Sequence, residues 1–260
     1  MKITISAMVA AMALSAVSPA VAAPIDPLAL YRFEQGNASD TSGNGNDGTV
    51  VGGVTFLGAG SGYDGLGRAA DVAITSGLSG IDTGLDIQAS LFPELTFGAW
   101  VFADTSGSTP GGKVLSHDNG SFDRTLGIDS RGSVPGSDYS AFTGSGVVDT
   151  GEGISGWTHI AASYDGSTVS LYQNGLLAAT AADATDLDIT IFNLFIGTNP
   201  GFDEDFDGRI DEVFVYGRSL NGGEILDIFE NGFDDRPVPL PGAIVLFVPF
   251  AAAALRKVRK

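Results

Sequence analysis

Residues 157–181 read WTHIAASYDGSTVSLYQNGLLAATA. Apolar, β-branched and aromatic residues alternate with polar ones on both sides of Asp165-Gly166-Ser167, and Asn174-Gly175 supplies a second turn signal. Asn-Gly favours the two-residue turn of a β-hairpin, because both central residues of that turn need a positive φ. We therefore predict three antiparallel strands in a meander, over residues 157–164, 168–174 and 176–181.

The segment 23–236 has the length of one all-β domain and repeats these signals. Residues 95–102 form another strand-like run, whereas residues 219–229 place apolar side chains on one helical face, with Gly232 as a stop. We predict an all-β, two-sheet antiparallel jelly-roll sandwich with one short C-terminal helix. The recurring turn dipeptides are Asn44-Gly45, Asp47-Gly48, Asp64-Gly65, Asp165-Gly166, Asn174-Gly175 and Asp207-Gly208.

Residues 1–22 have the layout of a secretory signal peptide. Lys2 precedes a short apolar run, and the small residues Ala20-Val21-Ala22 fit a cleavage site. The apolar run is short for crossing about 30 Å of hydrocarbon. We therefore expect cleavage after Ala22 rather than an uncleaved membrane anchor.

Residues 237–260 form a three-part tail. A proline-rich stretch (237–241) precedes an uncharged run (242–255), and four basic residues close the chain. As a helix the uncharged run would extend about 21 Å at ~1.5 Å per residue, which is marginal for a permanent membrane span. The basic end would stay on the cytoplasmic side.

This tail is similar to the sorting signals of exosortase substrates, the PEP-CTERM group in its VPLPA variant. Val238, Pro239, Leu240 and Pro241 match the motif, whereas Gly242 stands where the motif has alanine. The resemblance implies an exported protein of a Gram-negative envelope, surface or medium. It also implies a C-terminal transmembrane helix that holds the chain transiently in the inner membrane, and processing by an exosortase-type enzyme. An ordinary single-pass tail anchor is the alternative.

The domain between the two ends is strongly acidic. Segment 23–236 carries all 31 acidic residues and 8 of the 13 basic ones, a formal charge of −23. Such a surface repels nucleic acid and anionic lipid, so we expect no nucleic-acid partner. The chain has no cysteine, so the fold must rest on its core or on a metal rather than on disulfides.

Four groups of motifs follow one another in a fixed order along the domain. They are Leu30-Tyr31-Arg32-Phe33; the glycine-rich stretch 40–48; Trp157-Thr158-His159-Ile160-Ala161 with Tyr164-Asp165-Gly166 and Leu171-Tyr172-Gln173-Asn174-Gly175; and Phe206-Asp207-Gly208-Arg209-Ile210-Asp211-Glu212-Val213 with Tyr216, Arg218-Ser219-Leu220 and Glu224-Ile225 behind it. This order resembles the LamG-like, concanavalin A-like lectin/glucanase superfamily over nearly the whole domain. The resemblance implies a jelly-roll sandwich whose edge loops bind ligands, often near calcium, but it leaves the ligand open.

The glycine-rich loop 40–47 is a candidate calcium site. It places two carboxylates and an amide where backbone carbonyls could complete the about six to eight oxygens that Ca²⁺ takes. The family resemblance implies that an acidic residue of the 210–213 strand closes the site. The predicted ligands are Asp40, Asn44, Asp47 and Asp211. The alternative is that these residues build Asx-turns in a solvated loop.

A second acidic loop carries Asp203, Asp205 and Asp207 at the spacing of the first half of a calcium-binding loop. Position twelve of that loop would be Phe214 instead of a bidentate glutamate. We therefore interpret this loop as acidic surface with weak calcium affinity at most.

The sequence lacks the carboxylate pattern of a glucanase. Glucanases of the resembled superfamily carry Glu-x-Asp-x-x-Glu on one strand for nucleophile and acid roles, and the nearest stretch, 209–214, lacks both outer glutamates. Only two histidines are available for a serine–histidine pair. We assign His159 to packing or hydrogen bonding in its strand and expect His117 to be exposed. Trp100 and Trp157 could stack on sugars, but both lie in apolar strands, where core packing is expected.

The sequence therefore predicts an exported, surface-sorted and non-catalytic module, stabilised by Ca²⁺, that binds a glycan or an extracellular matrix protein. The ligand is expected at the loops 40–47 or 203–207. A structural matrix or biofilm protein without a dedicated ligand is the first alternative, and a glycoside hydrolase is the second.

Overall fold

The computed structural model describes residues 27–72, 78–104, 112–118, 120, 122–129, 131, 138–185 and 192–233. The predicted signal peptide (1–22) and the predicted tail with its transmembrane helix (237–260) lie outside these residues. Across the described ranges, no helix combines the length and the apolar character needed to cross a membrane.

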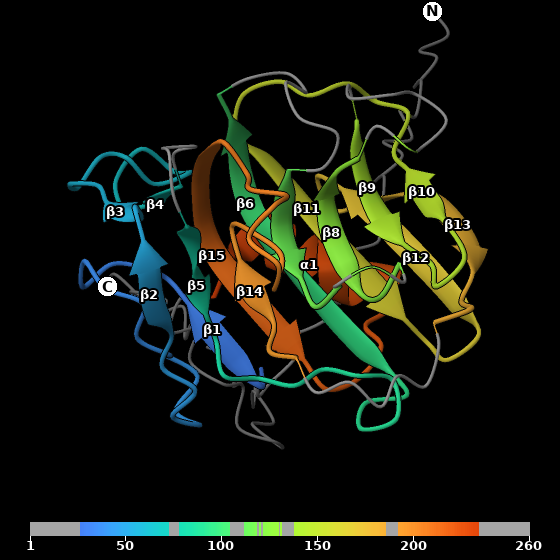
Figure 1. Cartoon of the computed structure of the whole chain (residues 1–260). Coiled ribbons are helices and arrows are strands. Elements are labelled where there is room, and N and C mark those ends of the chain that lie inside the picture. Colours follow the sequence, from blue (N-terminus) through green and yellow to red (C-terminus); the bar gives the residue numbers. More distant parts are fainter. Residues whose placement is uncertain are drawn as a thin grey trace, which may run out of the picture.

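Two antiparallel sheets stack face to face, which confirms the predicted sandwich (Figure 1). Sheet A runs from one edge as β13 (Leu176–Ala182), β12 (Thr168–Gln173), β11 (Thr158–Tyr164), β6 (Leu95–Ala103), β15 (Gly208–Tyr216), β4 (Ala70–Val72) and β3 (Thr55–Phe56), with β1 (Ala29–Tyr31) also paired to β15. Sheet B runs as β10 (Val147–Asp149), β9 (Tyr139–Phe142), β8 (Thr125–Ile128), β7 (Lys113–Ser116), β14 (Phe195–Ile196), β5 (Ser79–Asp82) and β2 (Thr49–Gly52).

The main core lies between the two sheets and follows the period-2 alternation of the strands. In β6, every second residue from Leu95 to Val101 points inward and is fully buried. Alternate residues of β11, from Ile160 to Tyr164, point the same way. The side chains between them therefore face outward, away from sheet B.

The predicted meander is present. β11, β12 and β13 pair in order, with Tyr164 opposite Val169. Asn174 and Gly175 have φ values of 50° and 77°, so both central residues of this turn take the left-handed conformation that a hairpin needs.

The helix α1 (Gly222–Asn231) lies behind sheet A, on its outer face (Figure 1). It begins three residues later than predicted because Asn221 caps it: the side chain of Asn221 accepts hydrogen bonds from the first turn, and the side chain of Glu224 bonds back to the backbone of Asn221. The helix ends at Gly232, as expected, with φ 62°. Its apolar face forms a second core against sheet A.

The loop between β3 and β4, residues 57–69, also covers the outer face of sheet A. Its Tyr63 stacks on Trp100 with ring centroids 4.4 Å apart, and Phe229 of α1 stacks on Trp100 at 5.4 Å. The middle of the outer face is therefore closed by aromatic rings. We call this part of the outer face, around the half-buried Trp100, the covered strip.

Candidate functional site

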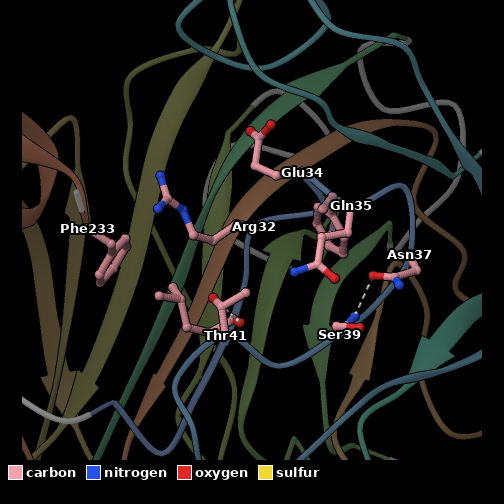
Figure 2. A pocket seen from close by; sticks show the side chains of 9 residues that line it. Arg32, Glu34, Gln35, Asn37, Ser39, Thr41 and Phe233 are labelled. Carbon is pink, nitrogen blue, oxygen red and sulfur yellow. Dashed lines mark hydrogen bonds between the residues drawn. The ribbon is translucent and has the colours of Figure 1, made fainter. Parts of the chain in front are cut away.

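A cavity of about 320 Å³ opens on the outer face of sheet A, beside β1 (Figure 2). β1 and the loop that follows it line one side, and Phe233, just after α1, faces them from the other. We call this cavity the β1 pocket. It is lined by Leu30, Arg32, Phe33, Glu34, Gln35, Asn37, Ser39, Thr41 and Phe233.

The loop behind the pocket is organised by the carboxylate of Asp40. One carboxylate oxygen accepts hydrogen bonds from the backbone N–H groups of Leu30 and Ser42, at 3.0 and 2.8 Å. The other accepts from the Ser42 hydroxyl and from the backbone of Asn46, both at 2.9 Å. Burial works against ionisation of Asp40, but these hydrogen bonds outweigh it and lower its pKa. The neighbours Ser39 and Thr41 consequently line the pocket.

Arg32 is fixed in the pocket by an ion pair. Its Nε donates to Glu212 Oε1 at 2.8 Å, with 29% of the Arg32 side chain and 5% of the Glu212 side chain exposed. Glu212 is the extra residue of a β-bulge, because β15 advances three residues from Asp211 to Phe214 while β6 advances two. Its φ is 48°. The bulge thus places a carboxylate beside Arg32 that regular pairing would have turned inward.

Asp211 precedes this bulge and lies under the 57–69 loop, outside the lining of the β1 pocket. It is 2% exposed, and its Oδ2 accepts from the backbone N–H of Tyr63 at 3.1 Å. Burial raises the pKa of Asp211 to about 8, and the nearby Glu212 charge adds to the rise. Asp211 is therefore largely protonated at neutral pH and closed off from solvent.

A family model of the concanavalin A-like lectin/glucanases superfamily matches residues 79–226, more than half of the chain. The chain belongs to this superfamily. No curated protein matches the sequence.

Solved structures with a similar fold include domain 4 of AbnA, a GH43 extracellular arabinanase from Geobacillus stearothermophilus, in complex with arabinotriose. It is 22% identical with a TM-score of 0.60, over 79% of this chain and 98% of that one. The binding domain of Paraclostridial Mosquitocidal Protein 1 is 15% identical (TM-score 0.57, 78% of this chain and 52% of that one). The botulinum neurotoxin serotype D binding domain is 14% identical (TM-score 0.54, 79% and 51%). This chain spans about half the length of these two proteins, and likeness at such identities establishes the fold alone.

Glucanase chemistry in this superfamily would need two carboxylates that reach the sugar. On the 210–213 strand the candidates are Asp211 and Glu212. The backbone of the covering loop closes on Asp211, since a Cβ added to Gly62 would lie 2.9 Å from its Oδ2. Glu212 is engaged by Arg32. Neither carboxylate is presented to the pocket as a free acid or base.

The predicted calcium ligands are only partly brought together. Asp40, Asn44 and Asp47 share one loop, in which Asp47 accepts from the backbone N–H of Asp40 at 2.8 Å. Asn44 donates to the carbonyl of Pro27 at 2.9 Å. Asp211 does not join them: in the part of the chain that the structure describes, no three acidic, histidine or cysteine side chains are grouped to hold an ion.

The donor set does not fit the four-residue site. Both oxygens of Asp40 are already used by loop donors, as the Asx-turn alternative expects. Calcium binding by the loop stays a prediction.

The second acidic loop is held by its own neighbours. Asn199 donates to Asp203 at 2.8 Å, and Thr198 donates to Asp205 at 2.5 Å. The backbone carbonyl of Asp207 accepts from Asp104. This network explains the acidic spacing without an ion.

The structure confirms the prediction for His159 and contradicts the one for His117. His159 packs as expected: it is fully buried, stacks on Phe214 at 5.8 Å and meets the edge of Trp100 at 5.4 Å. The expected exposure of His117 is wrong. His117 is 2% exposed and its Nε2 lies 3.2 Å from Asp86 Oδ1, because a residue 31 positions earlier packs over the strand end. Burial lowers the pKa of His117 despite this carboxylate.

The expected core role of the tryptophans is wrong, because both side chains are half-buried on the outer face of sheet A and neither belongs to one of the two cores. Trp100 packs between Tyr63 and Phe229, on the outer face. Trp157 lies beside Phe102, at a ring-centroid distance of 5.9 Å. It precedes β11 by one residue and so shares the outward parity of His159.

The pocket residues Gln35, Asn37 and Phe233 were not singled out by the sequence. A partial signal existed for Arg32: inward Ala29 and Tyr31 put Leu30 and Arg32 on the opposite face of the strand. Phe233 gave no such signal, since its place depends on where α1 ends.

Proposed function

We propose that this protein is an exported, non-catalytic module that binds a neutral glycan in the β1 pocket. The pocket carries the proposal: it combines an aromatic ring, a guanidinium held in place, and several amide and hydroxyl groups. Export, surface sorting through the predicted tail and a contribution of Ca²⁺ belong to the same proposal. They rest on the sequence.

The chemistry of the lining suits a sugar. Phe233 offers a ring to the apolar face of a pyranose or furanose, while Arg32 donates and Glu34 accepts hydrogen bonds from hydroxyl groups. Gln35 and Asn37 can do both. At about 320 Å³ the cavity lies at the lower end of the about 300–1,000 Å³ range of small-ligand pockets.

The charge of the domain supports a neutral ligand. With a formal charge of −23 over 23–236, the surface repels polyanions such as acidic polysaccharides or nucleic acid. The similar fold of the arabinanase domain also supports a neutral ligand, because that domain was solved with arabinotriose, a neutral sugar. An associated protein partner with a basic surface is the other ligand class that this charge allows.

Binding without catalysis is supported by the state of the two candidate carboxylates. Asp211 is covered and Glu212 is paired with Arg32. A retaining or inverting glycosidase needs one carboxyl as acid and a second as nucleophile or base at the scissile bond. The pocket lining supplies Glu34 as its single carboxylate.

The proposal is tested by isothermal titration of the protein with arabinotriose, cellohexaose and mannohexaose. Gln35→Ala and Phe233→Leu should each weaken binding by about tenfold, the effect of losing roughly 1.4 kcal/mol. Gln35 is exposed, whereas Phe233 also packs against the second core beside Phe214. Leucine keeps an apolar side chain at position 233, and urea unfolding of each variant checks the fold.

Thr180→Ala is the matched control, because Thr180 is exposed on β13, a strand that does not line the pocket. Equal affinity of wild type and both pocket variants for a bound sugar would refute the pocket assignment. Release of reducing sugar would refute the non-catalytic part, and Asp211→Asn would then show whether Asp211 carries it.

A second function, that of a self-associating matrix protein, is favoured by the edge strand β13. Its seven residues carry no charge, and Leu176 and Leu177 are 65% and 57% exposed. Uncharged exposed edges are templates for pairing with another chain. Sedimentation of wild type against Leu177→Lys tests it: a shift from oligomer to monomer supports self-association, and a monomer in both refutes it.

A further inference from the structure

Four side chains form a row across adjacent strands on the outer face of sheet A. Arg209 on β15 lies opposite Phe102 on β6 and opposite Asp71 on β4. Trp157 continues the row, because the next residue, Thr158, pairs with Val101, one position before Phe102. We call Trp157, Phe102, Arg209 and Asp71 the Trp157 row.

Three of the four members, Trp157, Phe102 and Arg209, are held in place by ring contacts. The guanidinium carbon of Arg209 lies 3.9 Å from the ring centre of Phe102 and 5.3 Å from that of Trp157. The rings of Phe102 and Trp157 meet edge to face at 5.9 Å. Stacking on Phe102 fixes the plane of the guanidinium, so its N–H edge is directed before a ligand arrives.

The hydrogen-bonding capacity of Arg209 is not used by the fold. Among the residues that the structure describes, its guanidinium has ring contacts but no hydrogen bond or ion pair. A guanidinium has five N–H donors in a rigid fork. Asp71 beside it adds an acceptor, so the row ends in a donor and an acceptor placed side by side.

The row also lies outside the covered strip of the outer face. Two residues further along the same strands, Trp100 is closed in by Tyr63 and Phe229. All four members of the Trp157 row are half-buried. Part of each side chain is therefore exposed to solvent, and among the described residues none of the four has a ring contact with α1 or with the 57–69 loop comparable to those of Trp100.

We propose that the Trp157 row is a second binding surface, which takes a neutral, extended oligosaccharide. The indole of Trp157 would stack on a sugar ring, Arg209 would donate to hydroxyl oxygens, and Asp71 would accept from hydroxyl protons. Three strand spacings of about 4.8 Å give the row a length of about 14 Å. This length fits several linked sugar rings rather than one.

The local charge selects a neutral chain over an acidic one. Asp104 and Asp207 lie beside the row, joined through a backbone hydrogen bond of 3.0 Å, and with Asp71 they outnumber the single cation Arg209. A polyanion would meet net repulsion here. The neutral hydroxyl groups of a sugar can accept from the cationic Arg209 and donate to the anionic Asp71 without such repulsion.

The row and the β1 pocket are separate places on the same sheet. Leu30 of the pocket pairs with Phe214. Phe214 lies opposite Gly98 and Arg209 opposite Phe102, so the two places are four residues of β6 apart, or about 13 Å of strand. The covered strip with Trp100 lies between them. The inference shares the glycan class with the proposed function but none of its residues, so the two fail separately.

The test is titration of the full chain with arabinotriose, cellohexaose and mannohexaose, and with polygalacturonate as the acidic comparison. Arg209→Lys keeps the charge but removes the fork, and Trp157→Ala removes the stacking ring. We expect each to weaken neutral-sugar binding at the row by about tenfold or more. Thr180→Ala is the control, and urea unfolding of each variant checks the fold.

Tryptophan fluorescence gives an independent readout. Sugar binding at the row should change the emission of Trp157, and Trp157→Phe should remove that change while Trp100 stays in place. Gln35→Ala, in the pocket, should leave it intact. If Trp157→Ala does not fold, Arg209→Lys and the fluorescence change carry the test.

The outcomes separate the two sites. Loss in the row variants with retention in Gln35→Ala supports the row. Loss in Gln35→Ala alone overturns the row and leaves the pocket standing. No binding of any neutral sugar overturns both, and preference for polygalacturonate overturns the neutral ligand.

Discussion

Replacing His159 with phenylalanine should stabilise the protein, and the gain should grow as the pH falls. His159 is fully buried on the outer side of β11, between Phe214, Trp100 and the ring of Phe229. Neither ring nitrogen has a hydrogen-bond partner within the described residues. A phenyl ring would keep the stacking and remove two unsatisfied polar atoms.

The expected size of this stabilisation follows from the burial of the two ring nitrogens. An unsatisfied buried polar group costs about 1–3 kcal/mol, and the slightly larger ring gives back part of the gain through tighter packing. We expect a net gain of about 1 kcal/mol at pH 7.

Burial also lowers the pKa of His159 to about 3, from 6.5 in the unfolded chain. Below pH 6.5 the unfolded state therefore takes up a proton that the folded state does not. The unfolding free energy of wild type therefore falls by about 1.4 kcal/mol per pH unit below pH 6.5 because of this histidine, or by about 3 kcal/mol at pH 4.5.

Urea unfolding at pH 7.0, 5.5 and 4.5 measures both parts. The difference in unfolding free energy between His159→Phe and wild type should widen as the pH falls, whereas Thr180→Ala should follow wild type. A constant difference across the three pH values would refute the reasoning, because it would mean that His159 is protonated in the fold or bonded to a partner.

Three other substitutions test other parts of the structure. Asp40→Ala removes a carboxylate that accepts four hydrogen bonds and should cost about 2–4 kcal/mol in urea unfolding; it should also blunt any rise in melting temperature with Ca²⁺, and a wild-type curve unmoved by Ca²⁺ would rule out the predicted site. For Asp211→Asn, the unfolding free energy relative to wild type should rise by about 1.4 kcal/mol per pH unit between pH 5 and 8, because the raised pKa of Asp211 makes its ionisation in the folded state increasingly unfavourable over that window. An unfolding free-energy difference that is the same at pH 5 and pH 8 would contradict the raised pKa. Gly98→Ala would place a Cβ 2.5 Å from the carbonyl oxygen of Ile160 and should cost about 2–3 kcal/mol or more, whereas Gly146→Ala, with nothing within 4 Å, should be close to neutral in the same assay.

The parts of the fold that depend on near neighbours could be predicted from the sequence. The meander follows from local turn chemistry, and Asn174 and Gly175 take the positive φ values that their dipeptide favours. The helix could be placed because its apolar spacing and its stop at Gly232 are local signals. Its start was set by the capping of Asn221, which moved it by three residues.

The candidate site depends on distant residues, and the sequence alone could not place it. Arg32 and Glu212 are 180 positions apart, and they meet only because β1 pairs with β15 and a bulge turns Glu212 outward. His117 was misjudged for the same kind of reason, as its cover comes from Asp86. The exposure of Trp157 follows from where α1 and the 57–69 loop stop covering the sheet.

The position of Phe233 ties the pocket to the way the domain could be attached. Phe233 lines the pocket, and the proposed sorting tail, residues 237–260, follows it closely in the sequence. A tether joined after residue 233 would thus begin at the pocket rim. In the proposed surface-attached form, a sugar held in the pocket would therefore lie next to the point of attachment.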